Sequence, residues 1–129
     1  MLQWDFQGSI EANRQALKRK EDLLLAHYNT GQAYLYLGDA EGTVRCNRRV
    51  IDLDPNHGAG HYYLAVGLLA LGHVGEARDE VTRARFLGHS PDPKFLQALD
   101  LAEKKAQNKS EEIRGTNTGA DAPNDSNRR

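Results

Sequence analysis

The feature of this 129-residue sequence that most constrains its fold is an internal repeat with a period of 34 residues. A shift by 34 positions aligns identical residues: His27 with His61, Tyr28 with Tyr62, Leu35 with Leu69, Leu37 with Leu71 and Gly38 with Gly72. The same shift backwards aligns Asp39 with Asp5, Gly42 with Gly8, Asn47 with Asn13 and Arg48 with Arg14. Three copies in one register predict that a single structural unit is stacked along the chain.

Within each copy, apolar residues recur with the period of an α-helix rather than that of a strand. The pattern predicts a pair of helices in each of two complete copies, at 24–37 and 40–53 and then at about 60–71 and 75–87. Gly38 and Gly72 suit the turns between paired helices, because glycine accepts a left-handed backbone at low cost. Pro55 ends the first pair, since proline cannot continue a helix.

Helix pairs that repeat every 34 residues resemble the tetratricopeptide repeat family, whose pattern is W-x2-L-G-x2-Y, then A-x3-F, then P. At these positions the copy 24–57 has His27, Thr30, Gly31, Tyr34, Thr43, Asn47 and Pro55. The copy 58–91 has His61, Leu64, Ala65, Leu68, Ala77, Val81 and His89. Histidine replaces the tryptophan twice, and the final proline is absent from the later copy. Gly31 and Ala65 keep the small residue where paired helices approach each other, and the resemblance extends over residues 5–91.

The resemblance implies an all-α fold, in which antiparallel helix-turn-helix repeats stack in a right-handed superhelix, an αα solenoid. The expected repeat domain spans 1–105, with a half repeat at 5–23, full repeats at 24–57 and 58–91, and a C-terminal capping helix at 92–105. Asp92 and Pro93 are suited to start that capping helix. The composition of 106–129 predicts a disordered tail, because the segment has too few apolar side chains to form a core.

In the resembled family, the first helix of each repeat lines a concave groove that binds a segment of another protein. By position, the implied partner-binding residues are Leu25, Tyr28, Asn29, Gln32 and Tyr36 from one repeat, and Ala59, Tyr62, Tyr63, Val66 and Leu69 from the next. Tyrosine suits such a surface because it combines a rigid apolar ring with a polar tip. The expected function is therefore that of a protein-protein interaction module or adaptor, which binds a peptide or helix of a partner. For each tyrosine, packing between helices is the competing interpretation.

A structural function is the alternative. The first copy matches only the second helix of a unit, and its apolar residues Ile10 and Leu17 lack a partner on one side. Repeat units cannot bury their apolar faces alone. On this hypothesis the chain is a subunit or fragment of a longer array, which self-associates or docks through its exposed first helix.

No group of residues in the sequence points to an enzyme. His57 and His61 have a spacing that could share a metal on one helix, but His57 lies at the Pro55 junction and no third ligand is near. Cys46 has arginine neighbours, but no histidine is placed to act as its base. The sequence therefore predicts no catalytic residue, no cofactor and no metal site.

The charge balance bears on partners and location. Lysine plus arginine number 17 and aspartate plus glutamate 18, for a net charge of -1, which does not favour nucleic acid or a membrane surface as the partner. The first residues lack the pattern of a secretory signal, and no stretch approaches about 18 uninterrupted apolar residues. With a single cysteine, the sequence predicts a soluble cytoplasmic protein.

Overall fold

The computed structural model describes residues 19–121, and of residues 115–121 it describes the backbone only. Within this range lie five α-helices and no strand: α2 Lys20–Leu37, α3 Ala40–Leu53, α4 Gly58–Ala70, α5 Val74–Phe86 and α6 Pro93–Asp121. The prediction of an all-α fold is therefore confirmed for the described residues. They divide into two compact units between Pro91 and Asp92. Most of the predicted half repeat, up to residue 18, lies outside the described residues.

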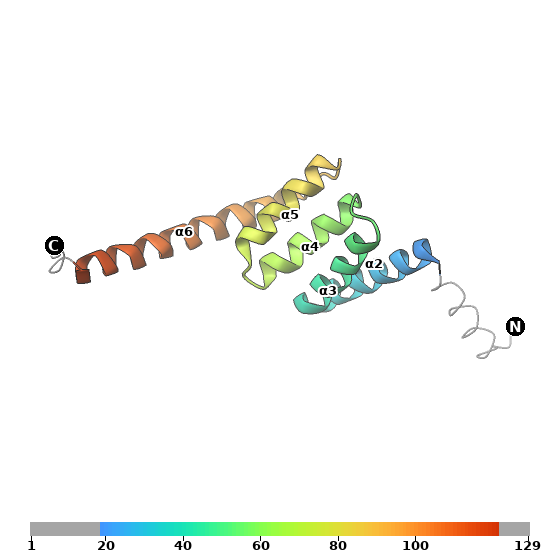
Figure 1. Cartoon of the computed structure of the whole chain (residues 1–129), viewed down its shortest axis with the longest axis horizontal. Helices are drawn as coiled ribbons and strands as arrows, with labels where there is room; N and C mark the ends of the chain where they lie inside the picture. Colours follow the sequence, from blue (N-terminus) through green and yellow to red (C-terminus); the bar gives the residue numbers. More distant parts are fainter. Residues whose placement is uncertain (1–18, 122–129) are drawn as a thin grey trace, which may run out of the picture. The chain divides into compact units, whose positions relative to one another are not determined.

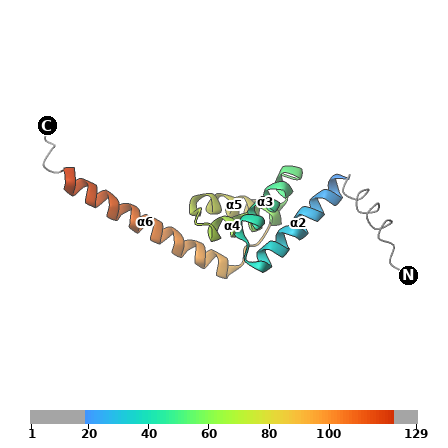
Figure 2. The same cartoon turned by 90° about the horizontal axis from the view of Figure 1, so that it is seen from below.

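The first unit consists of the four helices α2 to α5, which lie side by side in chain order (Figures 1 and 2). Helix α3 packs against both α2 and α4, and α4 packs against both α3 and α5. The fully buried apolar side chains come from the last three of these helices: Val50, Leu64, Ala65, Ala77, Val81 and Ala84. The core of this unit therefore lies around α4, which has a helix on either side.

The turns show that the sequence repeat is also a structural repeat. Gly38 and Gly72, 34 positions apart, adopt left-handed backbone conformations with φ of 79° and 85°. At each turn the glycine N–H donates to the carbonyl three residues back, and the next N–H donates to the carbonyl five residues back. These bonds satisfy carbonyl groups that a helix end leaves unpaired, and they reverse the chain within two residues.

Two glycines of α4 allow it to approach α3 closely. A Cβ atom on Gly60 would lie 2.8 Å from Val50 Cγ1, and one on Gly67 would lie 2.8 Å from Val44 Cγ2. Both distances are shorter than van der Waals contact, so a larger residue at either position would push the helices apart. The close approach explains why α4 contains glycines despite their low helix propensity.

The observed helix bounds differ from the predicted ones mainly at α2. Helix α3 spans its predicted range, whereas α2 begins at Lys20, four residues before the predicted start at 24. The next junction is broken by Pro55, but the equivalent position has Glu21, which can enter a helix. Asp22 also accepts a 2.7 Å hydrogen bond from Arg19 Nε at the helix start.

The second unit is the helix α6, which begins as the sequence predicts. The Asp92 side chain accepts a 2.9 Å hydrogen bond from the Lys94 backbone N–H, with Pro93 at the first helical position. The helix continues to Asp121, past the predicted end at 105 and through most of the segment expected to be disordered. Good helix formers continue beyond 105 as far as Arg114, and Gln107 donates to Glu111 one turn later. Residues 122–129 lie outside the described residues.

Candidate protein-interaction surface

The first helix of each pair differs in charge from the second. Helix α2 from Leu23 onward and the whole of α4 contain no aspartate, glutamate, lysine or arginine, whereas α3 and α5 are rich in all but lysine. Charged side chains keep a helix face in water, so the first helices provide the faces suited to packing or to a partner. The predicted partner-binding residues all lie on α2 and α4.

Five aromatic rings gather where α2 and α4 lie near the two junctions, and we call them the ring cluster. Tyr28 of α2 lies 6.0 Å from Tyr63 of α4 and 5.4 Å from His57, measured between ring centroids. Tyr62 lies 5.0 Å from Tyr63 and 4.8 Å from His89. The two tyrosine pairs meet edge to face, at interplanar angles of 70° and 73°, which is the favoured geometry for aromatic contacts.

The structure places the four predicted tyrosines in different environments. Tyr28 and Tyr63 are half-buried members of the ring cluster, each presenting part of its ring to the surface. Tyr62 is only 7% exposed, so packing within the protein accounts for most of its ring. Tyr36 is 91% exposed at the end of α2 and makes none of the ring contacts of the cluster. Packing between helices, the competing interpretation, therefore applies to Tyr62.

The remaining predicted residues extend along the same two helices. Leu25 and Asn29 are exposed, whereas Gln32, Ala59, Val66 and Leu69 are half-buried. The side-chain nitrogen of Gln32 is buried and has no hydrogen-bond partner among the described residues. An unpaired buried amide N–H carries a free-energy cost, which a hydrogen bond donated to an acceptor of a partner would relieve.

Sequence reasoning missed the two histidines of the ring cluster. His57 precedes α4, and its Nδ1 accepts a 2.8 Å hydrogen bond from the Gly60 backbone N–H, which caps the helix. This bond leaves the proton of the neutral ring on Nε2. His89 follows α5, where its backbone N–H donates to the Ala84 carbonyl. Both histidines stand at junctions between pairs, and that position is the signal that could have identified them.

The Tyr28 hydroxyl acts as a neutral group. Burial raises the pKa of Tyr28, and the neighbouring Tyr63 raises it further by repulsion between the two phenolates. The phenol therefore keeps its proton throughout the neutral range and can both donate and accept a hydrogen bond. Together, the uncharged rings and helices form a surface whose recognition depends on shape, apolar contact and neutral hydrogen bonds.

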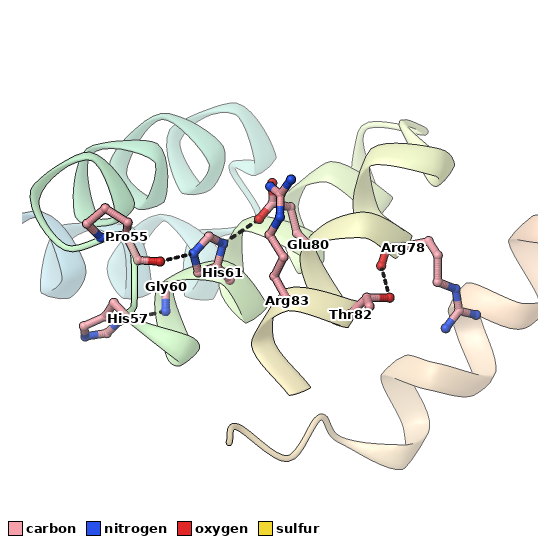
Figure 3. Close-up of polar contacts among 8 residues, drawn as sticks. All are labelled: Pro55, His57, Gly60, His61, Arg78, Glu80, Thr82 and Arg83. Carbon is pink, nitrogen blue, oxygen red and sulfur yellow. Dashed lines mark hydrogen bonds and ion pairs between the residues drawn. The ribbon is translucent and has the colours of Figure 1, made fainter. Parts of the chain in front are cut away.

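The residues considered for metal binding or nucleophilic chemistry have other contacts. His61 has one ring nitrogen 2.6 Å from Glu80 Oε1 and the other 2.7 Å from the Pro55 carbonyl, so neither is turned towards His57 (Figure 3). Within residues 19–121, no three histidine, cysteine or acidic side chains are grouped as metal ligands. Cys46 is buried, and burial raises the pKa of its thiol. None of the described helices is long and apolar enough to cross a membrane.

The comparisons with known proteins add no assignment to this geometry. No model of a known protein family matches the chain. No solved structure matches it either.

Proposed function

We propose that this chain is a protein-interaction module of the tetratricopeptide repeat type, which binds an uncharged, largely apolar peptide or helix of a partner protein. On this proposal, the helix pairs stack as a solenoid and α2 and α4 line its concave face. Tyr28 and Tyr63 are the anchors of the bound segment, and Leu25, Gln32 and Val66 extend the contact along the two helices.

The observation that carries the proposal is the combination of the ring cluster with the absence of charge on α2 after its first turn and on α4. Half-buried tyrosines at the meeting point of two helices offer large contact areas that lose little conformational entropy on binding. Binding on this surface needs no desolvation of charged groups, because the lining helices have none beyond the first turn of α2. The affinity for the partner should accordingly change little with salt.

The proposal is tested by capture of partners on the immobilised full-length protein from a lysate of its source cell. The informative variant is Tyr28→Leu with Tyr63→Leu, which removes two partly exposed rings and keeps apolar volume. Tyr62→Ala is a poor choice because the ring is buried and its loss would leave a cavity. Leu101→Ser is the control, since it removes an exposed large apolar side chain from α6 instead.

Circular dichroism first establishes that all three proteins are folded. We expect specific partners to be retained by wild type and Leu101→Ser and lost by the double variant, at both 50 mM and 300 mM salt. Retention of the same partners by the double variant would show that the ring cluster is not the binding surface. Loss in high salt would show that a charged face, on α3 or α5, binds instead.

A cavity lined by residues of α2 and α3 favours a second candidate function, assembly with another repeat. The cavity has a volume of about 480 Å³ and is lined by Leu23, Ala26, His27, Thr30, Tyr34 and Cys46 among others. Ala26 is equivalent, 34 positions earlier, to Gly60, through which α4 packs against α3. Helix α2 thus presents to the cavity the face that α4 buries.

For this second candidate we propose a helix of another copy of this chain as the occupant of the cavity. The mass of the protein in solution, measured by light scattering after size exclusion, is then that of a dimer. Ala26→Arg should return it to a monomer by filling the cavity with a third bulky cation beside Arg45 and Arg49, whereas Tyr36→Ser should leave it dimeric. A wild-type monomer at all accessible concentrations rules out this assembly.

A further inference from the structure

A second cavity lies where the junction before α4 meets the end of α5, and we call it the His61 cavity. Its volume is about 510 Å³, and its mainly apolar lining includes Pro55, His61, Thr82, Arg83, Phe86 and Leu87. None of these residues belongs to the ring cluster or to the predicted partner-binding set. The volume is in the range of cavities that hold small ligands, so one large side chain fits in it.

Two lining residues of the cavity, His61 and Arg83, belong to a polar network with Glu80 (Figure 3). His61 is 5% exposed, and its two ring nitrogens face the Pro55 carbonyl at 2.7 Å and Glu80 Oε1 at 2.6 Å. Arg83 Nη1 donates to Glu80 Oε2 at 3.2 Å. The network holds the buried His61 ring in the wall and leaves the Arg83 side chain largely exposed at the opening.

The rim of the cavity is apolar and basic. Phe86 is 90% exposed, although a ring of this size normally finds cover in a folded protein. Arg83 and Arg85 precede it on the last turn of α5, and both are exposed. An uncovered aromatic ring within three residues of two arginines matches a ligand that offers an apolar group and negative charge together.

The equivalent place in the first complete repeat has a different character. The residues 34 positions before Phe86, Thr82 and Pro55 are Asp52, Arg48 and Glu21, all of them charged. The repeat therefore folds with charged side chains at these positions, and its architecture does not require the apolar lining. The apolar residues Phe86 and Pro55 are therefore not dictated by the repeat, although Leu87 has an apolar equivalent in Leu53.

We propose that the His61 cavity is a second binding site, which takes one large apolar side chain of a peptide whose flanking residues are acidic. The apolar side chain enters between Phe86, Leu87 and Pro55, and the flanking carboxylates pair with Arg83 and Arg85. Because the site shares no residue with the ring cluster, its peptide and the partner on α2 and α4 bind independently. The two sites also differ in salt dependence, since only this one uses charge.

The test is a peptide array probed with the full-length protein labelled with a fluorophore. Each peptide has one central position, occupied in turn by phenylalanine, leucine or alanine, and flanks that are acidic, uncharged or basic. We expect the strongest signal for phenylalanine or leucine between acidic flanks, with at least a tenfold loss for alanine or for basic flanks. The dissociation constant of the best peptide should rise several-fold between 50 mM and 300 mM salt.

Variants then locate the binding. Phe86→Ser and Arg85→Gln change exposed residues, so both should remain folded, and each should weaken the best peptide about tenfold or more. Tyr36→Ser removes an equally exposed ring from α2 and should leave the affinity unchanged. Equal signals for acidic and basic flanks, or no loss with Phe86→Ser, would overturn the proposal. Displacement of the peptide by single-stranded oligothymidylate, at a lower concentration than by unlabelled peptide, would assign the site to nucleic acid and overturn it too.

Discussion

Helices α2 and α4 are equivalent in the repeat, yet the protein buries them to different extents. Both lack charged side chains, apart from the first turn of α2. Seven of the 13 residues of α4 are buried, whereas in α2, with 18 residues, Gly31 alone is buried. The difference follows from neighbours: α4 packs between α3 and α5, while among the described helices α2 packs against α3 only. An uncharged helix therefore serves as core in one place and as an available surface in the other.

This comparison gives tests at equivalent positions of the two repeats. Where one of the two positions is buried and the other is not, the buried one should be the more sensitive. A result in which both positions respond equally would mean that the exposed face of α2 is covered in solution.

The largest difference is expected for the two equivalent histidines, His61 and His27. The side chains of His61 and Glu80 are only 7% and 12% exposed. His61→Leu therefore leaves Glu80 without its main partner and should lower the free energy of unfolding by about 3 kcal/mol. In the first repeat, the residue equivalent to Glu80 is Cys46, which has no charge to leave unpaired. His27→Leu should therefore change the free energy of unfolding by about 0.5 kcal/mol or less. Urea denaturation followed by circular dichroism measures both; a cost above 2 kcal/mol at His27 contradicts the comparison.

The next effect concerns the close approach of α4 to α3. Gly60→Ala introduces a methyl group 2.8 Å from Val50 Cγ1 and should destabilise the protein by about 2 kcal/mol. At the equivalent position of α2, Ala26 lines an open cavity, and Ala26→Val should stay within about 0.5 kcal/mol of wild type. Thermal melts of the two variants decide between an open and a filled cavity. A large loss with Ala26→Val would mean that another segment occupies it.

A smaller effect, of opposite sign, is expected at Asn47. This residue is fully buried, and its Oδ1 has no hydrogen-bond partner among the described residues, although Nδ2 donates to the Thr43 carbonyl. The equivalent residue, Val81, is also fully buried and has no such requirement. Asn47→Val should stabilise the protein by about 1 kcal/mol, because it removes an unsatisfied acceptor. A destabilised variant would indicate that Oδ1 has a partner in solution.

The smallest effects are expected at the helix caps. The Asp39 side chain accepts a 2.9 Å hydrogen bond from the Gly42 N–H, whereas its equivalent His73 makes no side-chain cap. Asp39→Ala should cost about 1 kcal/mol, and His73→Asp should contribute about 0.5 kcal/mol by adding the missing cap. Chemical denaturation resolves both changes in the free energy of unfolding if the two variants are measured together. No gain from His73→Asp would show that the two turns are not equivalent.

Local signals in the sequence were sufficient where neighbouring residues decide the outcome. The bounds of α3 follow from the Asp39 cap and from Asp54-Pro55, and Gly38 and Gly72 identify the turns. The start of α2 was placed too late, because it was set by the apolar stripe, whereas Glu21, at the position equivalent to Pro55, can enter a helix. The segment after 105 was predicted to be disordered on apolar content, but its helix formers extend α6 instead.

The candidate surface could be predicted only in outline. Position within the repeat selected Tyr28, Tyr62 and Tyr63 together, and the structure brings these three rings into contact. Position within the repeat could not rank these rings by exposure, because the neighbouring helices and junctions set how much of each ring is covered. For the same reason it missed His57 and His89, which reach the cluster from the junctions.

The sequence by itself determined the all-helical class, the turns at Gly38 and Gly72 and the two uncharged first helices, because periodicity, glycine and charge act over a few neighbouring residues. Only the tertiary structure decided that Tyr62 is covered while Phe86 is not, and that His61 meets Glu80. Such contacts join residues far apart along the chain. They depend on how closely whole helices approach one another, which no short segment specifies.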